Sequence, residues 1–464
     1  MRSDEARDAG YLLGEALGTT TRSIGQVHDA VGARVFRLLG RPARPVQLVH
    51  DGIAKSVYGI VRQGTRVAPR VGGLVAARHR PPNAPSVADS RAGNAVLGAL
   101  NGAWGDAIAA RYRSLAYGMD VRVDGRNVPV APGPMAEGFP TASARIVVFL
   151  HGLCETDDSW HAGSQKYYGD ATTSFGSRLQ EELGWTPVYL RYNTGLHISD
   201  NGRRFAYLMQ ALVDSWPVPV EDIALVGHSM GGLVMRSGCH YATLHNEQLH
   251  NEQLHNEQRA EEQLGTSTGA GAAAPNTSTQ LTWTDELRHV FNLGTPHLGA
   301  PLEARTAKVS ARLARLPETA PAARLLNSRS LGVKDLRHGS LLDEDWADID
   351  LDTHLDDSCG DVPFLPTAHY YFIGATLHQS PDHLLSKVLG DLLVLLPSAS
   401  GQGKARSLPF EVERGRHIGG LNHFHLLNHP AVYEQIRTWL MDPPAPETTP
   451  TAGEAAAAVQ DAQK

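Results

Sequence analysis

Residues 222–234 read DIALVGHSMGGLV and contain the pattern Gly-x-Ser-x-Gly. The apolar run before the pattern is typical of a buried strand, and the residues after it are typical of a helix. A serine on a tight turn between a strand and a helix adopts a strained backbone that exposes its hydroxyl, so we predict that Ser229 is a nucleophile. Gly227 and Gly231 let the strand and the helix approach closely, and His228 completes the motif.

Short runs of β-branched and aliphatic residues alternate with helical patterns from about residue 144 onward. This alternation predicts an α/β fold with a doubly wound, mostly parallel sheet whose crossovers are helices. The expected strands are Arg145–Leu150, Pro187–Tyr192, Asp222–Val226, His289–Leu293, Tyr370–Ala375 and Glu411–Arg416. Helices are expected over Gly202–Val213, after a turn at 199–201, and over Ala431–Leu440.

The first 140 residues have helical patterns instead. Apolar residues recur at helical spacing in two sets, and each set predicts one stripe packed against a core. The sets are Val46, Val49, Ile53, Val57 and Ile60, and then Leu97, Leu100, Trp104 and Ile108. The proline-rich run 80–85 is a linker between them. We therefore expect an N-terminal helical region over 1–140, a catalytic α/β domain over 141–441 and a disordered tail over 442–464.

Two segments of the α/β domain are expected to be insertions. Residues 244–258 repeat LHNEQ three times and a Gly/Ala/Ser/Thr-rich run follows, which predicts a low-complexity surface insert over 244–280. The repeat histidines are five residues apart and would not share a helix face, which argues against a metal site. Residues 299–366 lie between two expected strands and are predicted to form a cap over the site, or else a structural excursion that never touches substrate.

A nucleophilic serine needs a histidine base and a carboxylate that orients the base, and in this kind of sheet the chain order is Ser, acid, His. His423 follows the last expected strand and is the predicted base. Asp391, with apolar neighbours, is the predicted acid. The competing histidines are His425 and His429, and the weaker acid candidates, in loop-like sequence, are Asp361 and Asp382.

The oxyanion of an acyl-transfer reaction needs two backbone N–H donors. The first is expected at Met230, directly after the serine at the start of a helix. The second is expected at Leu153, because His151-Gly152-Leu153 follows an early strand and the glycine permits a turn that aims this amide inward. The alternative is that His151-Gly152 only ends the strand.

Together these motifs resemble the bacterial lipase and esterase branch of the α/β-hydrolase superfamily related to GPI inositol-deacylase-like lipases. The resemblance covers roughly residues 140 to 441. Its supporting segments are HGLCETDDSW at 151–160, NTGLHISDNGRRFA at 193–206, NLGTPHLGAPLE at 292–303, RSLGVKDLRHG at 329–339 and NHFHLLNHPAVY at 422–433. It implies carboxylic ester hydrolysis with Ser229, Asp391 and His423 as the triad. Such families usually have a Gly-Asp-x-x-Val-Pro-like motif around the acid. Here Gly390-Asp391 is followed by Leu396-Pro397, which is a longer spacing.

Composition limits the partners and the compartment. The net charge of −7 with 42 dispersed Lys and Arg gives no basic block, so nucleic acid is not an expected partner. Cys154, Cys239 and Cys359 form no C-x-x-C pair, which predicts neither disulfides nor zinc and fits a cytoplasmic location. The N-terminal stretch lacks a signal-peptide core and no run reaches about 18 apolar residues, although attachment to a membrane surface stays open.

The expected function is that of a serine esterase or lipase. It would hydrolyse carboxylic esters of lipid-like character through an acyl-enzyme on Ser229, without metal or organic cofactor. Two alternatives stay open: an acyltransferase with the same triad, and a lipid-surface binding protein whose N-terminal helices do the work beside a vestigial core. The sequence does not predict the acyl length, the head group or the oligomeric state.

Overall fold

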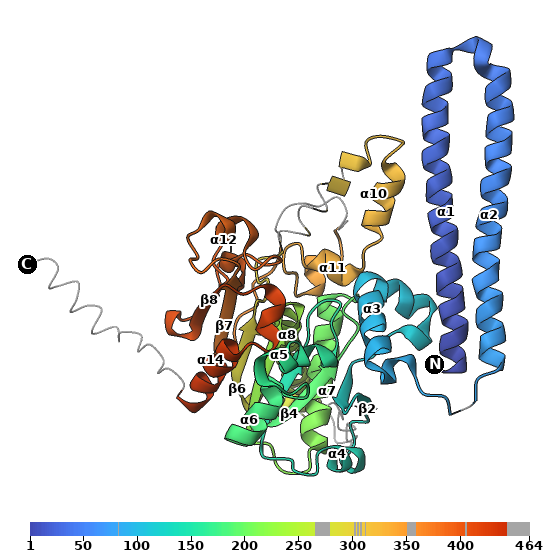
Figure 1. The fold of residues 1–464 in the computed structure, drawn as a ribbon. Helices are drawn as coiled ribbons and strands as arrows, with labels where there is room; N and C mark the ends of the chain where they lie inside the picture. The colour runs from blue at the N-terminus through green and yellow to red at the C-terminus, as the bar shows by residue number, and fades with distance from the viewer. Residues whose placement is uncertain are drawn as a thin grey trace, which may run out of the picture.

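The computed structural model describes residues 1–81, 83–264, 279–300, 303, 306, 309–310, 312–349, 359–403 and 406–442. Eight strands form one sheet in the order β2-β1-β4-β3-β5-β6-β7-β8 (Figure 1). The six strands from β3 to β8 run parallel, and β1 and β2 are antiparallel at one edge. The strands are β1 Asp120–Val123, β2 Arg126–Val128, β3 Arg145–Leu150, β4 Thr186–Arg191, β5 Asp222–His228, β6 Leu287–Leu293, β7 His369–Thr376 and β8 Gly415–Gly419.

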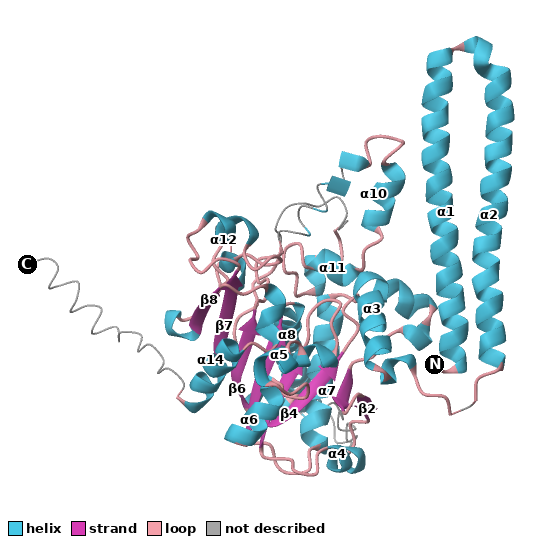
Figure 2. Cartoon of the chain, viewed as in Figure 1, coloured by secondary structure: helices cyan, strands magenta, loops and turns pink. Residues whose placement is uncertain are grey.

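Helices cover both faces of the sheet (Figure 2). Successive residues of β3 point to opposite faces, so Ile146 and Val148 join one core while Val147 and Phe149 join the other. The first core includes α4 Pro132–Gly138, α7 Ile198–Ser215 and α8 Met230–Leu264, and the second includes α6 Phe175–Leu183 and α14 Pro430–Met441. This doubly wound, mostly parallel sheet confirms the expected α/β-hydrolase fold class.

The strand predictions were accurate in the centre of the sheet and failed at its edges. The last strand was predicted over Glu411–Arg416, but the observed strand is β8 Gly415–Gly419. The difference arises because Val412–Arg414 form a 3₁₀ turn. The strands β1 and β2 were missed, since each is short and they lie inside the region predicted to be helical. The expected turn at 199–201 instead belongs to the first turn of α7.

The helix α3 Arg91–Arg111 packs against the loop that follows β3. Leu97 and Ile108 are buried as predicted, but Trp104 is 41% exposed because the helix kinks there, with φ −146° and ψ 29°. Gly102 permits the close contact, since a Cβ on it would lie 2.8 Å from the Cα of Cys154. The N-terminal region therefore holds an element that packs closely against the α/β domain, with a small apolar cluster of its own.

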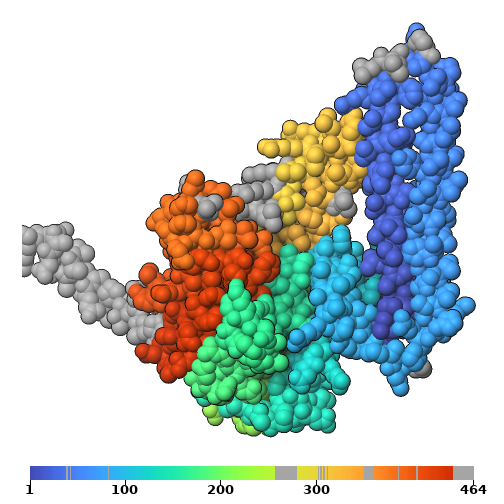
Figure 3. Space-filling view, in the orientation of Figure 1, coloured from blue at the N-terminus to red at the C-terminus, as the bar shows by residue number. Residues whose placement is uncertain are grey.

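The helices α1 Ser3–Leu39 and α2 Arg44–Arg78 form a long antiparallel hairpin that projects from the rest of the molecule (Figures 1 and 3). The predicted stripe from Val46 to Ile60 is 51–73% exposed, so the prediction that it packs on a core was wrong. The reason is that α2 packs against α1 through another face.

The other helices are α5 Ser164–Tyr168, α10 Ala320–Asn327, α11 Leu331–Asp335, α12 Leu384–Leu389 and α13 Leu396–Ala399. The LHNEQ repeats continue α8, the helix that follows the predicted nucleophile, and residues 251–255 are exposed. Residues 265–278 of the predicted insert, 350–358 and parts of 301–311 of the predicted cap, and 443–464 of the predicted tail lie outside the described residues. Of the cysteines, Cys154 is exposed and Cys239 is buried.

Candidate active site

Ser229 stands at the carboxyl end of β5, where α8 begins. Its φ of 52° is in the left-handed region, as a nucleophile elbow requires. Its backbone N–H donates to the carbonyl of Leu293 at 2.8 Å, which ties the turn to β6. Gly231 allows the turn to sit against the neighbouring strand, since a Cβ there would lie 2.2 Å from the carbonyl oxygen of Leu150. A Cβ on the motif residue Gly227 would lie 2.6 Å from the backbone nitrogen of Gly232, so the strand and the helix approach closely here as well.

Asp391 lies after α12, and His423 lies after β8. The structure brings their side chains together. The Nδ1 of His423 lies 2.7 Å from Oδ2 of Asp391, and both side chains are buried. The backbone N–H of His423 also donates to the Asp391 carbonyl at 2.9 Å. The other carboxylate oxygen accepts from the amides of Leu393 and Val394 at 3.0 and 2.8 Å. The carboxylate is therefore fixed on both sides, and it holds Nδ1 so that Nε2 is the free ring nitrogen.

The Nε2 of His423 is buried and has no hydrogen-bond partner, and it belongs to a side chain that lines the same cavity as Ser229. A histidine held in this way is suited to accept a proton from a serine hydroxyl.

The competing candidates lie elsewhere. His425 and His429 pack around the ring of Tyr167, and the Nδ1 of His429 caps α14 by accepting from the amide of Ala431. Asp382 is exposed and pairs with Lys387 at 3.2 Å. Asp361 is exposed as well.

The two predicted oxyanion donors, Leu153 and Met230, lie next to Ser229 in the cavity lining and in the chain, respectively. Leu153 follows the Gly152 turn and lines the cavity beside Ser229. Met230 is the first residue of α8, where the backbone N–H has no partner within the helix. Gly152 approaches Ser229 closely, since a Cβ on it would lie 3.0 Å from the Cβ of that serine. His151 is fully buried, and the hydroxyl of Tyr192 donates to its carbonyl at 2.7 Å, which anchors the loop from behind.

A buried ion pair that the sequence analysis missed lies beneath these residues. Glu155 accepts from the amide of Gly152 at 2.6 Å and contacts the Nδ1 of His228 at 2.9 Å. The Nε2 of His228 in turn donates to the carbonyl of His423 at 3.1 Å. Glu155 thus connects the Gly152 turn with the turn at Ser229 and, through His228, with the loop of His423. The only signal in the sequence was a carboxylate four residues after His151.

The surroundings of this pair favour the charged form of both partners. Burial alone would raise the pKa of Glu155, but the charge and hydrogen bond of His228, together with the hydrogen bond from the Gly152 amide, lower it. Burial alone would lower the pKa of His228, but the Glu155 carboxylate, together with the His423 carbonyl, raises it. His228 therefore has a charged partner in place, which fixes its ring orientation.

The cavity at Ser229 has a volume of about 260 Å³ and a mostly apolar lining. One wall comes from the segment that was predicted to be a cap, through Ala300, Val333 and Leu336 among others. Charged groups on that wall pair with one another, since Glu303 accepts from Arg329 at 2.7 Å and lies 3.4 Å from Arg337. The site therefore presents an apolar slot next to a candidate nucleophile.

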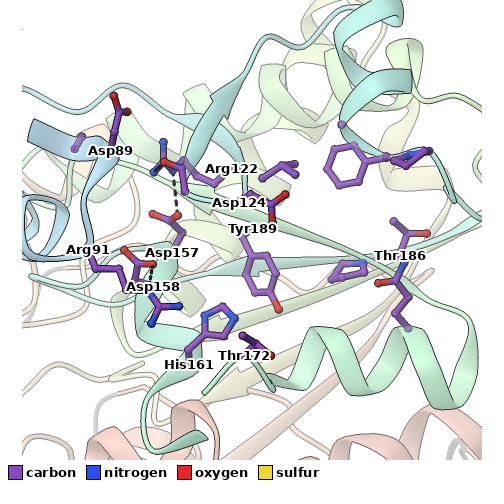
Figure 4. A pocket seen from close by; sticks show the side chains of 18 of the residues that line it. Asp89, Arg91, Arg122, Asp124, Asp157, Asp158, His161, Thr172, Thr186 and Tyr189 are labelled. Atoms are coloured by element: carbon purple, nitrogen blue, oxygen red, sulfur yellow. Dashed lines mark hydrogen bonds and ion pairs between the residues drawn. The ribbon is translucent and has the colours of Figure 1, made fainter. Parts of the chain in front are cut away.

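A larger hollow of about 620 Å³ lies near β1 and the start of α3, away from Ser229 (Figure 4). Four of its charged residues form two pairs: Arg122 pairs with Asp157 at 3.0 Å, and Arg91 lies 3.9 Å from Asp158. The hollow lacks the residues of the predicted triad, and we assign it no chemistry. Among the residues that the structure describes, no group of three or more His, Cys, Asp or Glu side chains could hold a metal ion.

The sequence matches no protein-family model and no curated protein. Solved structures with some likeness include the mature lipase BlEst2 of Bacillus licheniformis, which is 14% identical, with 64% of this chain and 91% of that chain covered and a TM-score of 0.35. Lipase 1 of Pelosinus fermentans is 13% identical, covers 65% and 99%, and has a TM-score of 0.36. EstA of Clostridium botulinum is 13% identical, covers 64% and 87%, and has a TM-score of 0.34. At these values the likeness carries no information about the activity of this chain, nor about the predicted GPI inositol-deacylase-like branch.

Proposed function

We propose that the protein is a serine hydrolase that cleaves carboxylic esters through an acyl-enzyme on Ser229. One observation carries the proposal: a serine in the strained elbow conformation and an aspartate-held histidine with an unpaired Nε2 line the same apolar cavity. This combination supplies a nucleophile, a base and a substrate pocket in one place.

In the proposed mechanism, the Nε2 of His423 takes the proton of the Ser229 hydroxyl while the oxygen attacks the ester carbonyl. Asp391 holds the imidazole and stabilises its charged form. The Leu153 and Met230 amides donate to the oxyanion, and in comparable sites a donor of this kind contributes roughly 3 kcal/mol, about a hundredfold in rate. His423 then protonates the leaving alcohol, and water releases the acid by the same steps.

The cavity favours an apolar acyl group. Its volume of about 260 Å³ lies near the lower end of ligand-pocket sizes, so short and medium acyl chains should fit without rearrangement. Longer, lipid-like chains require the wall that contains Ala300, Val333 and Leu336 to move. We propose that the segment 299–366, to which these residues belong, is the cap that sets chain length. The apolar lining supports a lipid-like ester over a charged substrate.

The test is hydrolysis of p-nitrophenyl esters of increasing chain length by the purified protein and by Ser229→Ala and His423→Ala variants. We expect both variants to lose activity by roughly 10³-fold or more. His425→Ala is the matched control, because that histidine lies away from the cavity, and it should retain activity. An inactive wild-type protein, or unchanged rates in the first two variants, would contradict the proposal. Product analysis with added glycerol separates hydrolysis from acyl transfer.

A further inference from the structure

The hairpin of α1 and α2 has its bulky aliphatic residues on the outside. On α2, five of them stand seven residues apart and form what we term the α2 stripe: Val46, Ile53, Ile60, Val67 and Leu74. Each is 40–73% exposed. Val49, Val57 and Val71 lie beside the stripe and are also exposed. A row of this length on a helix normally faces a core or a partner.

Small and polar residues fill the contact between the two helices. A Cβ on Gly10 would lie 2.5 Å from the carbonyl oxygen of Pro69, and one on Gly25 would lie 3.2 Å from the ring of Tyr58. The ring of His28 stacks on His50 at 5.0 Å. Only Ala54 and Gly73 of α2 are buried. The hairpin therefore has small, polar and aromatic residues inside and its bulky aliphatic residues outside, unlike a pair of helices that buries an aliphatic seam away from water.

The body of the molecule does not cover the stripe. The helix α1 lies between α2 and the body, and α10 approaches α1 (Figure 1). Arg324 donates to Gln26 at 2.6 Å, and Arg34 pairs with Glu318 at 2.7 Å. The stripe residues are therefore exposed, and α2 forms the flank of the hairpin that lies away from the body (Figures 1 and 3).

The hairpin is basic although the whole chain is acidic. Residues 1–80 carry 13 Arg and Lys against 6 Asp and Glu, a net charge of +7 in a chain of −7. Four of the six acids lie within the first 15 residues. Three of these contact the body: Glu5 accepts from the amide of Val87, Asp8 accepts from the hydroxyl of Ser114, and Glu15 pairs with Arg111. From residue 16 to residue 80 the sequence has 11 basic residues and only two acidic ones, Asp29 and Asp51.

We infer that the hairpin docks on an anionic lipid surface, with the α2 stripe in the interface and the basic side chains among the head groups. Exposed aliphatic rows combined with Arg and Lys are the features by which helices bind such surfaces. No helix in the described ranges is long and apolar enough to cross a membrane. A second copy fits less well, because two hairpins of net charge +7 would meet without the acidic flanking positions that pair helices in coiled coils.

The experiment is flotation of the full chain, carrying Ser229→Ala, with vesicles of equal parts phosphatidylcholine and phosphatidylglycerol and with vesicles of phosphatidylcholine alone. We expect binding to the anionic vesicles, at least tenfold weaker binding to the neutral ones, and loss of binding in 0.5 M salt. The inference concerns binding only, so wild type and Ser229→Ala should float equally whether or not the protein is a hydrolase.

Two double variants distinguish binding through the α2 stripe from non-specific adsorption of the protein to vesicles. Ile53→Ser with Ile60→Ser should weaken binding at least tenfold, while Leu384→Ser with Val412→Ser, which removes from the body two aliphatic residues that are at least as exposed, should not. Circular dichroism checks that the helices persist. Failure of the wild-type chain to float, or equal loss in both double variants, overturns the inference. A dimer in sedimentation equilibrium that the stripe variant abolishes would assign the face to a second copy instead.

Discussion

At the residue scale, several independent contacts fix the position of His423. Asp391 holds the imidazole through a side-chain contact of 2.7 Å and a backbone hydrogen bond of 2.9 Å, and two amides hold the carboxylate in turn. The backbone contacts should keep the loop in place even when the charge is removed. The role of the carboxylate can therefore be separated from its contribution to folding.

We predict that Asp391→Asn lowers kcat by about 10⁴-fold, because the amide would favour the wrong tautomer of His423. The melting temperature should change little, since the backbone contacts remain. The measurement is steady-state ester hydrolysis beside a thermal melt. Asp382→Asn, at an exposed ion pair, serves as the control. A variant that keeps more than a tenth of the wild-type kcat would remove Asp391 from the proposed triad.

The pair Glu155 and His228 predicts a pH-dependent contribution to stability. The lowered pKa of Glu155 gives stability above its ordinary pKa of about 4.3, and this is lost as the pH falls through the lowered value. The raised pKa of His228 gives stability below its ordinary pKa of about 6.5, and this is lost as the pH rises through the raised value. The wild type should exceed Glu155→Gln in stability most strongly between about pH 4.3 and 6.5.

Urea unfolding of both proteins across this range measures the difference, with Glu434→Gln, at an exposed surface pair, as the control that should show almost none. If Glu155 also positions the residues of the site, Glu155→Gln should lower kcat and leave KM nearly unchanged. A stability difference that is constant with pH would show that the pair is not ionised in the folded protein.

At the element scale, α3 and the loop after β3 depend on close backbone contact. A Cβ on Gly102 would meet the backbone N and Cα of Cys154, both at 2.8 Å, next to the proposed oxyanion donor Leu153. Side-chain motion cannot relieve these contacts, because they are with backbone atoms. The loop itself must therefore move when this position changes.

We predict that Gly102→Ala destabilises the protein by about 1–3 kcal/mol and lowers kcat, since it displaces the Leu153 amide. Gly64→Ala is the matched control: it lies in α2 with nothing within 4 Å, and it should be neutral or stabilising by up to ~1 kcal/mol. Chemical denaturation and ester hydrolysis test both. Equal effects of the two changes would argue against a tight contact at Gly102.

At the scale of the whole molecule, the hairpin and the sheet differ in how they are stabilised. The central strands are buried on both faces, whereas α2 buries only Ala54 and Gly73. Local opening should consequently cost much less in the hairpin than in the sheet.

We predict that amides of α1 and α2 beyond about residue 20 exchange with deuterium at least a hundredfold faster than those of β3, β5 and β6. Peptide-resolved hydrogen exchange measures this in the protein alone. Addition of the anionic vesicles should slow exchange in α2 and leave the strands unchanged. Protection in the hairpin equal to that of the strands, without lipid, would mean that its outer face is already covered.

The sequence by itself determined the fold class and the central strands, because buried parallel strands are continuous apolar runs and the Gly-x-Ser-x-Gly turn has a fixed place after one of them. It also indicated Ser229, Asp391 and His423 as a possible group from chain order. Only the tertiary structure decided that Asp391 and His423 meet, that Glu155 pairs with His228, and that the edge strands β1 and β2 join the sheet. It also decided that the α2 stripe faces outward. The physical reason is that helical periodicity shows which residues share a face, but what that face packs against depends on contacts between segments far apart in the chain.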